Sequence, residues 1–343
     1  MRVDQFDFAL PADLIAQRPV RPREAARLLH VGAGLTDLRV ADLPSLFRAG
    51  DLMVLNDTRV LPTRFAARRG NAAVEVTLVQ PIGEAAWWAF ARPGKRLRAG
   101  DPVTLAEGLE ARVVEKDEAG RIRLDFTDLA GGALIERIKA RGAMPLPPYV
   151  KRPEGGDAAD HEAYQTVFAR RDGAVASPTA SLHLSETMLD TLRERGVETV
   201  FVTLHVGLGT FLPVKVEDTA DHVMHEEWFE IEEAAAARLD RARAEGRRVT
   251  AVGTTALRAL ESAAGPNGMR PGAATTGLFV KPGYRFRVVD RLMTNFHLPR
   301  STLFMLVAAF AGLERMRRAY AHAVAERYRF FSYGDASMLE RAP

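Results

Sequence analysis

The amino-acid sequence predicts an α/β protein: a layered α/β domain with an inserted small antiparallel β-barrel domain. Strand-like and helix-like segments alternate in the two outer parts of the chain, which is typical of a largely parallel sheet covered by helices. Between these parts lie short strand-like segments separated by turn residues, which is typical of a small barrel or sandwich. We therefore assign residues 1–60 and 148–343 to the α/β domain and residues 61–147 to the insert.

Composition narrows the class of protein. The chain has 343 residues, of which 47% are hydrophobic and 27% charged, enough for one large or two ordinary globular domains. Cysteine is absent, which excludes disulfides, thiolate nucleophiles and sulfur-ligated metals. No apolar run reaches the roughly 20 residues of a membrane span, and the first residues do not form a signal peptide. We therefore expect a cytoplasmic protein that does not enter a membrane, and we expect a monomer.

The expected elements of the α/β domain follow from apolar runs and their flanking residues. An apolar run also precedes Asn295 and reads as a further strand. The expected strands are Leu52–Leu55, Glu198–Leu204 and Arg248–Val252, and the expected helices are Glu186–Gly196, Glu232–Gly246, Thr255–Ala264 and Leu303–Phe310.

The insert shows alternating hydrophobicity with turn signals such as Gly70-Asn71 and Pro93-Gly94. One helix, Gly131–Arg141, is expected to close it. The expected strands are Ala73–Val79, Trp87–Arg92, Pro102–Leu105, Glu110–Glu115 and Arg121–Phe126.

The junction around Asn295 is the most informative part of the sequence. The apolar run breaks into Asn295-Phe296-His297, and Ser301 then starts an almost wholly apolar helix. Such a junction holds Asn295 and His297 at the end of a buried strand, beside the N-terminus of a helix. Functional residues are often held on loops by a rigid scaffold, so we predict a site here, although a histidine packed at a strand end is the alternative.

Two further strand ends carry residues suited to a ligand. After Leu204 come His205, Gly207, Gly209 and Thr210, where the glycines allow a close backbone approach but also fit a tight turn. After Val252, Thr254 and Thr255 start a helix that includes Arg258. Their hydroxyls and free amides suit a carboxylate, phosphate or ribose, and simple helix capping is the alternative.

The remaining histidines suggest acid–base or hydrogen-bonding roles. His183 precedes a helix, and His222 and His225 lie three residues apart beside acids. The spacing is not that of a zinc-binding helix and no cysteine assists, so we expect no metal. Histidine titrates near neutrality and suits proton transfer, although surface or packing roles remain open for both groups.

Basic residues gather on and beside the insert. The net charge is only +3, so the placement of the charges is more informative than their sum. Such clusters are most often solvated faces, but on one segment they favour a phosphate backbone. The clusters comprise Arg59, Arg64, Arg68 and Arg69, then Arg92, Lys95, Arg96 and Arg98, and Lys151 and Arg152 follow the Pro-rich segment that ends at Tyr149.

Motifs that lie in a fixed order along nearly the whole chain match those of one family. The matching segments are Gly50–Pro62, Met144–Tyr149, Val202–Phe211, Val252–Thr255, Thr294–Pro299 and Tyr328–Ala336. In these segments the chain resembles the S-adenosylmethionine:tRNA ribosyltransferase-isomerases of the queuosine pathway. The chain departs from the usual pattern at Ser177, Ser181, Leu184, Lys281 and Ser337, and the first three of these flank His183.

The resemblance implies that the ribosyl part of S-adenosylmethionine moves to 7-aminomethyl-7-deazaguanine at the wobble position of a tRNA with a GUN anticodon. Adenine and methionine leave, and epoxyqueuosine forms. The family's α/β domain with an inserted barrel agrees with the division above. S-adenosylmethionine is then a consumed co-substrate, and no cofactor is expected.

The reaction needs several positioned proton-transfer groups, because a proton leaves the carbon beside the sulfonium, adenine departs and an amine adds. We therefore predict His183, His205, Asn295 and His297 as catalytic, and Gly207, Gly209, Thr210, Thr254, Thr255 and Arg258 as donor-binding. The predicted tRNA-binding residues are Arg59, Arg64, Arg96, Tyr149, Lys151, Arg152, Arg329 and Tyr333.

Two alternatives come from other classes of protein. A conventional RNA methyltransferase also binds S-adenosylmethionine, but it should show a glycine-rich strand-to-helix loop early in the chain, and none is present. A non-catalytic RNA-binding protein needs basic and stacking residues but has no use for histidines at buried strand ends.

Overall fold

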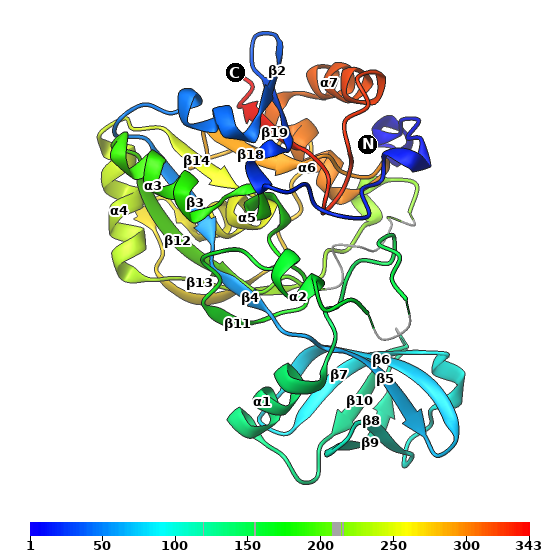
Figure 1. Cartoon of the computed structure of the whole chain (residues 1–343). Coiled ribbons are helices and arrows are strands. Elements are labelled where there is room, and N and C mark those ends of the chain that lie inside the picture. The colour runs from blue at the N-terminus through cyan, green and yellow to red at the C-terminus, as the bar shows by residue number, and fades with distance from the viewer. Residues whose placement is uncertain (119, 154–155, 208–213, 215) are drawn as a thin grey trace. The chain divides into compact units, whose positions relative to one another are not determined.

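A computed structural model of the chain describes residues 1–118, 120–153, 156–207, 214 and 216–343. The chain divides into two units (Figure 1): Met1–Thr58, Thr166–Arg171 and Ser177–Pro343 form the α/β unit, and Arg59–Gln165 with Asp172–Ala176 forms the barrel unit. The barrel unit extends past residue 147 because Gln165 binds back to Val60. Its Nε2 donates to the Val60 carbonyl at 2.7 Å, and its Oε1 accepts from the Val60 amide at 3.2 Å.

A nine-stranded sheet forms the centre of the α/β unit. Four neighbouring strands, β12, β3, β14 and β18, are parallel to one another. In the pairing of β12 with β3, Glu198 lies opposite Leu52 and Val202 lies opposite Asn56. The order across the sheet is β17 (Gly272–Thr276), β13 (Glu227–Ile231), β12 (Glu198–Leu204), β3 (Leu52–Asn56), β14 (Val249–Val252), β18 (Arg291–Asn295), β19 (Ala336–Glu340), β1 (Arg27–Val31) and β2 (Leu35–Arg39).

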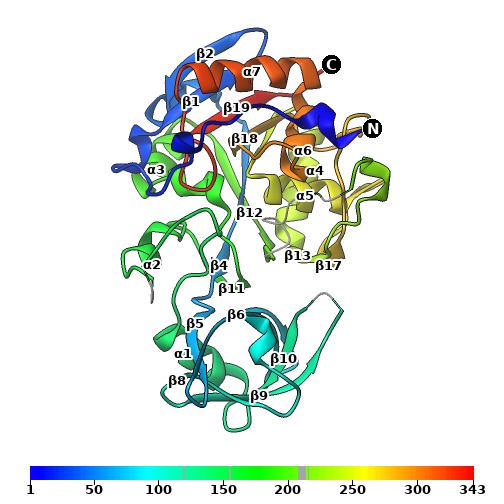
Figure 2. The same ribbon diagram turned by 90° about the vertical axis from the view of Figure 1, so that its right-hand side faces the viewer.

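Helices cover the sheet because its central strands are apolar on both faces. All five residues of β3 are buried, as expected for a parallel strand between two layers of helices. Met53 and Leu55 pack with Met188 of α3, and Figure 2 shows α3 on one side of the sheet and α4 and α5 on the other. The helices are α3 (Glu186–Glu194), α4 (Glu233–Ala244), α5 (Thr254–Ala263), α6 (Thr302–Ala311) and α7 (Leu313–Ala325).

Helix starts agree with the capping residues in the sequence. The hydroxyl of Ser301 accepts a hydrogen bond from the Phe304 amide at 3.1 Å and caps α6, and Ser185 caps α3 in the same way. Short elements complete the chain: η1 (Val3–Phe6), η2 (Ala12–Leu14), η3 (Arg23–Ala25), η4 (Val40–Leu46), η5 (Gly94–Arg96), α2 (Asp160–Ala163), η6 (Thr179–His183), η8 (Thr219–Asp221), the paired strands β4 (Thr58–Val60) and β11 (Arg171–Ala174), and the paired strands β15 (Ala264–Gly265) and β16 (Gly268–Met269).

The barrel unit is a closed six-stranded antiparallel barrel, so the predicted fold class is confirmed. Trp87, Val76 and Phe65 belong to its core, and α1 (Gly131–Arg141) packs Leu134 and Ile138 against that core. The strands, in their order around the barrel, are β10 (Ile122–Asp125), β7 (Ala86–Arg92), β6 (Ala72–Ile82), β5 (Arg64–Arg69), β8 (Pro102–Ala106) and β9 (Leu109–Lys116).

Strand β5 was not expected, because arginines occupy half of its positions. Its burial nevertheless alternates: Phe65 and Ala67 face the core, while Ala66 and Arg68 are exposed. Within the described part of the chain, no helix is long and apolar enough to cross a membrane. The same residues contain no group of three metal-ligating side chains that could hold an ion.

Candidate active site

The four parallel strands end at one edge of the sheet, and their following turns carry the polar residues of the candidate site. The side chain of Asn56 links three of these ends. Strand β3 stops opposite Val202, and the Asn56 amide continues the ladder: Nδ2 donates to the Leu204 carbonyl at 3.0 Å, and Oδ1 accepts from the Leu204 amide at 3.0 Å. Nδ2 also donates to Thr255 Oγ1 at 3.2 Å, and Oδ1 accepts from the Thr58 amide at 3.2 Å.

Asn56 had no predicted role, although it stands in a matching motif. Its side chain is fully buried, and both its donor and acceptor groups are used inside the protein. A polar residue at the last position of an otherwise apolar buried strand is the signal that could have identified it. It fixes the edge on which the predicted histidines lie.

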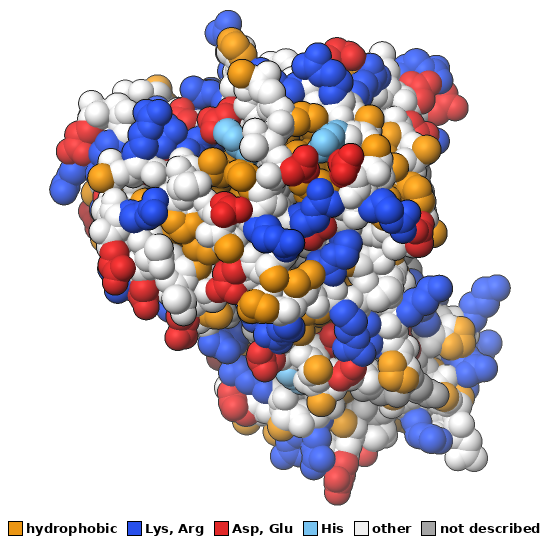
Figure 3. All heavy atoms as spheres, turned by 45° about the horizontal axis from the view of Figure 1, so that its top comes forward, with side chains coloured by type: hydrophobic (Ala, Val, Ile, Leu, Met, Phe, Trp, Pro, Cys, Tyr) orange, Lys and Arg blue, Asp and Glu red, His pale blue; other side chains and the backbone are white. Residues whose placement is uncertain are grey.

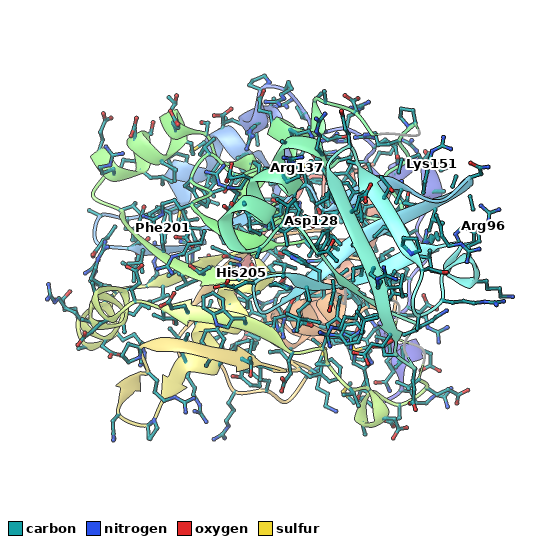
Figure 4. All side chains as sticks on the ribbon, turned by 90° about the horizontal axis from the view of Figure 1, so that it is seen from below. Arg96, Asp128, Arg137, Lys151, Phe201 and His205 are labelled. Atoms are coloured by element: carbon teal, nitrogen blue, oxygen red, sulfur yellow. The ribbon has the colours of Figure 1, made fainter. Side chains whose placement is uncertain are left out.

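His205 follows β12 at this edge. Its Nδ1 lies 2.8 Å from Thr58 Oγ1, and its ring stacks on Trp228 with centroids 4.8 Å apart and planes at 19°. The backbone amide of His205 also donates to the Trp228 carbonyl at 2.9 Å. The imidazole is thus held in one orientation, which suits a group that exchanges a proton at a defined place. Figure 4 labels Phe201, within β12, and His205, directly after it.

His183 and Asn295 form a second cluster. Asn295 Nδ2 lies 3.4 Å from His183 Nε2, and Thr179 Oγ1 donates to Asn295 Oδ1 at 2.8 Å. The Asn295 amide, held by Thr179, thus lies against the Nε2 edge of the His183 ring. Burial, with the charges of Arg329 and Arg23, lowers the pKa of His183 to about 4, so the ring is neutral at pH 7.

Two hydroxyls in the His183 segment have no hydrogen-bond partner among the described residues. They belong to Ser177 and Ser181, and both side chains are buried. These are two of the positions at which the chain departs from the pattern of the resembling family.

His297 lies among aromatic side chains. Its Nε2 is 3.2 Å from Thr294 Oγ1, its Nδ1 is 3.4 Å from the hydroxyl of Tyr320, and its backbone amide donates to that hydroxyl at 2.9 Å. Burial lowers the pKa of His297 to about 3. Both ring nitrogens therefore have protein partners, an arrangement typical of a structural histidine.

A cavity of about 380 Å³ lies beside the turn that follows β12. Gly207 and Arg258 line it, whereas Thr254, Thr255 and the four predicted catalytic residues do not. Arg258 forms a buried ion pair with Glu227, and Glu227 Oε1 accepts from the Gly207 amide at 3.0 Å. Glu227 had no predicted role, since its partner lies 31 residues away. Gly209 and Thr210 lie outside the described residues.

The two predicted threonines begin α5 directly after β14. Gly253, at φ +94°, allows the sharp turn into the helix. Thr254 is buried, and Thr255 Oγ1 accepts the bond from Asn56.

The predicted tRNA-binding arginines are largely held by the protein itself. Arg64 pairs with Glu75, and Arg96 Nη1 donates to the Ala73 carbonyl at 2.8 Å. Arg152 and Asp160 form an ion pair in which each side chain is only 2% exposed. Arg59 Nε lies 3.8 Å from Asp172, and Arg329 Nη2 lies 3.5 Å from Asp335.

The two predicted tyrosines differ from Lys151 in exposure. Tyr333 is buried and Tyr149 half-buried, whereas Lys151 is exposed. Lys151 is labelled in Figure 4. On the face drawn in Figure 3, basic and acidic side chains are mixed rather than gathered into a single-sign patch.

A groove of about 570 Å³ on the barrel unit brings four arginines together: Arg64, Arg68, Arg92 and Arg141. Arg68 and Arg92 are exposed, and neither forms an ion pair within the described ranges. Ala73 and Ala143 also line the groove, and their small side chains leave room for a ligand. The exposed arginines of this groove fit a phosphate backbone better than Arg96, whose guanidinium is bound to the Ala73 carbonyl.

Comparisons with known proteins agree with these features. The family described as queuosine biosynthesis protein matches residues 3–339. The chain is 56% identical to the S-adenosylmethionine:tRNA ribosyltransferase-isomerase of Rhodospirillum rubrum, covering 100% of this chain and 99% of that one. It is 53% identical to the protein of that name from Maricaulis maris, covering 99% of each. The crystal structure of S-adenosylmethionine tRNA ribosyltransferase from Thermotoga maritima superposes with a TM-score of 0.56 at 34% identity, covering 97% of this chain and 99% of that one.

Proposed function

Because the chain belongs to the queuosine biosynthesis protein family, we propose that it is a transferase that modifies tRNA with S-adenosylmethionine as ribosyl donor. It transfers and isomerises the ribosyl moiety onto 7-aminomethyl-7-deazaguanine at the wobble position, and it releases adenine and methionine. The product is epoxyqueuosine-tRNA. The observation that carries the proposal is the full-length match to ribosyltransferase-isomerases at 56% identity.

The edge of the sheet supports this chemistry independently. The reaction removes a proton beside the sulfonium, aids the departure of adenine and deprotonates the attacking amine, so it needs several oriented acid–base groups. His205, oriented by Thr58, suits one of these steps. His183 and Asn295 form a neutral pair suited to donating and accepting hydrogen bonds. His297, buried and doubly bonded, fits a supporting role better than direct proton transfer.

Substrate binding divides between the two units in this proposal. S-adenosylmethionine, as a consumed co-substrate, binds the α/β unit at the cavity lined by Gly207 and Arg258. Thr254 and Thr255 do not line that cavity, but they lie in the first turn of α5, the helix that carries Arg258, and in this proposal they contact the donor beyond the cavity. A tRNA with a GUN anticodon binds the barrel unit, whose groove offers Arg68 and Arg92 to the phosphates. The enzyme acts as a cytoplasmic monomer and needs no metal.

Product analysis tests the activity. The purified enzyme is incubated with S-adenosylmethionine and tRNA that carries 7-aminomethyl-7-deazaguanine. Adenine and methionine should appear in equal amounts, together with modified tRNA. S-adenosylhomocysteine as the product would indicate a methyltransferase instead. Absence of any product, with tRNA binding intact, would indicate an RNA-binding protein.

A further inference from the structure

A buried ion pair forms part of the lining of the cavity beside β12. Glu227 and Arg258 are both more than nine-tenths buried, and they bind each other, the Gly207 amide and, from Arg258 Nε, the Leu278 carbonyl at 3.1 Å. A buried pair with several hydrogen bonds holds its position without a ligand. The volume of about 380 Å³ lies within the range of roughly 300–1,000 Å³ for pockets that bind small molecules.

The charges around the cavity are unbalanced. Glu227 neutralises Arg258, and the other two carboxylates of the lining, Asp221 and Glu226, form no ion pair within the described part of the chain. Both are exposed at the rim. Among the described residues, the lining holds three carboxylates, Asp221, Glu226 and Glu227, against one guanidinium, Arg258. This part of the lining therefore favours a cation over a neutral molecule.

An aromatic wall adds to this preference. Phe279 lines the cavity and meets the ring of His222 edge to face, with centroids 5.3 Å apart. A phenylalanine face attracts cations and also accepts a flat purine ring. One positive charge opposes the preference: Lys281 Nζ lies 5.5 Å from the Phe279 ring and donates to Thr219 Oγ1 at 3.3 Å.

We infer that this cavity is the donor pocket and that its surplus negative charge selects the sulfonium cation. The inference rests on the proposed function, which supplies the donor. S-adenosylmethionine carries a net positive charge, whereas S-adenosylhomocysteine, methionine and adenine are neutral overall. The pocket therefore holds the donor more tightly than its neutral products, which favours product release after the sulfonium is consumed.

The test neutralises charges of opposite sign and compares a charged with a neutral ligand. Isothermal titration calorimetry at pH 8 measures the binding of S-adenosylmethionine and of S-adenosylhomocysteine. Glu226→Gln should weaken S-adenosylmethionine binding roughly 2- to 5-fold, and Lys281→Gln should strengthen it by a similar factor. Neither change should alter S-adenosylhomocysteine binding by more than about 1.5-fold. Glu194→Gln, on an exposed position of α3 away from the cavity, serves as the control.

The inference is supported if the two variants shift the affinity for S-adenosylmethionine in opposite directions and leave the affinity for S-adenosylhomocysteine unchanged. Unchanged S-adenosylmethionine affinity in both variants, or equal shifts for the two ligands, overturns it. Adenine release by the unaltered enzyme is measured in parallel. If adenine release persists while the charge effects are absent, the pocket assignment fails and the proposed function stands. If the charge effects appear without adenine release, the proposed function fails and the cation pocket stands.

Discussion

Replacing Asn56 with alanine tests whether this side chain holds together the edge of the sheet that carries the candidate site. The change leaves the Leu204 amide, the Leu204 carbonyl and the Thr58 amide without the partner they have now. Strand β13, on the opposite edge of β12, cannot supply new partners for Leu204. Its hydrogen bond at this point goes to the neighbouring His205 amide, which points to that other edge. A buried backbone group without a partner costs about 1–3 kcal/mol, so three such groups should cost roughly 3–6 kcal/mol, allowing for partial hydration.

Thermal unfolding followed by circular dichroism measures the effect. For a unit of this size each kcal/mol lowers the midpoint by about 2–4 °C, so Asn56→Ala should lower the α/β transition by at least about 6 °C. Thr203→Val is the matched control, since it removes one buried hydrogen bond, from Thr203 Oγ1 to Asp57, at the same strand end. It should cost about 1.5–3 kcal/mol, because the acceptor is a carboxylate. Equal shifts for the two variants would show that Asn56 does not bridge the strands as argued.

Three further predictions concern acid sensitivity, donor binding and tRNA binding. Burial lowers the pKa of His297 to about 3, so the unfolded chain binds the extra proton below pH 6.5 and the folded state loses stability as pH falls from about 6.5 towards 3. His297→Gln should therefore reduce the drop in unfolding midpoint between pH 7.5 and 5 while keeping turnover within about tenfold, and a 10²-fold loss would restore a proton-transfer role. Replacing Thr254 and Thr255 with valine should raise the apparent KM for S-adenosylmethionine more than it weakens tRNA binding, and the reverse order would contradict the assignment. Removing the charges of Arg68 and Arg92 should reduce the salt dependence of tRNA affinity by up to about one unit of log–log slope each, whereas an intact slope would move the contact surface to the α/β unit.

The sequence alone determined the architecture of this protein. Alternating hydrophobicity and turn residues are local signals, so the strand at Glu198–Leu204, the helix at Gly131–Arg141 and the presence of an inserted barrel were all predictable. The order of polar motifs at strand ends likewise pointed to one edge of the sheet, because parallel strands bring their carboxyl ends together.

Side-chain partnerships were decided only by the tertiary structure, because the partners are far apart in sequence. Asn56 binds Leu204, 148 residues away, and Asn295 binds His183, 112 residues away. Burial turned His297 from an expected acid–base group into a neutral ring between Thr294 and Tyr320. Glu75 binds Arg64 and leaves Arg68 as the exposed cation of β5. No local pattern encodes these pairings, since each depends on which distant residue the fold places beside a polar group that has left water.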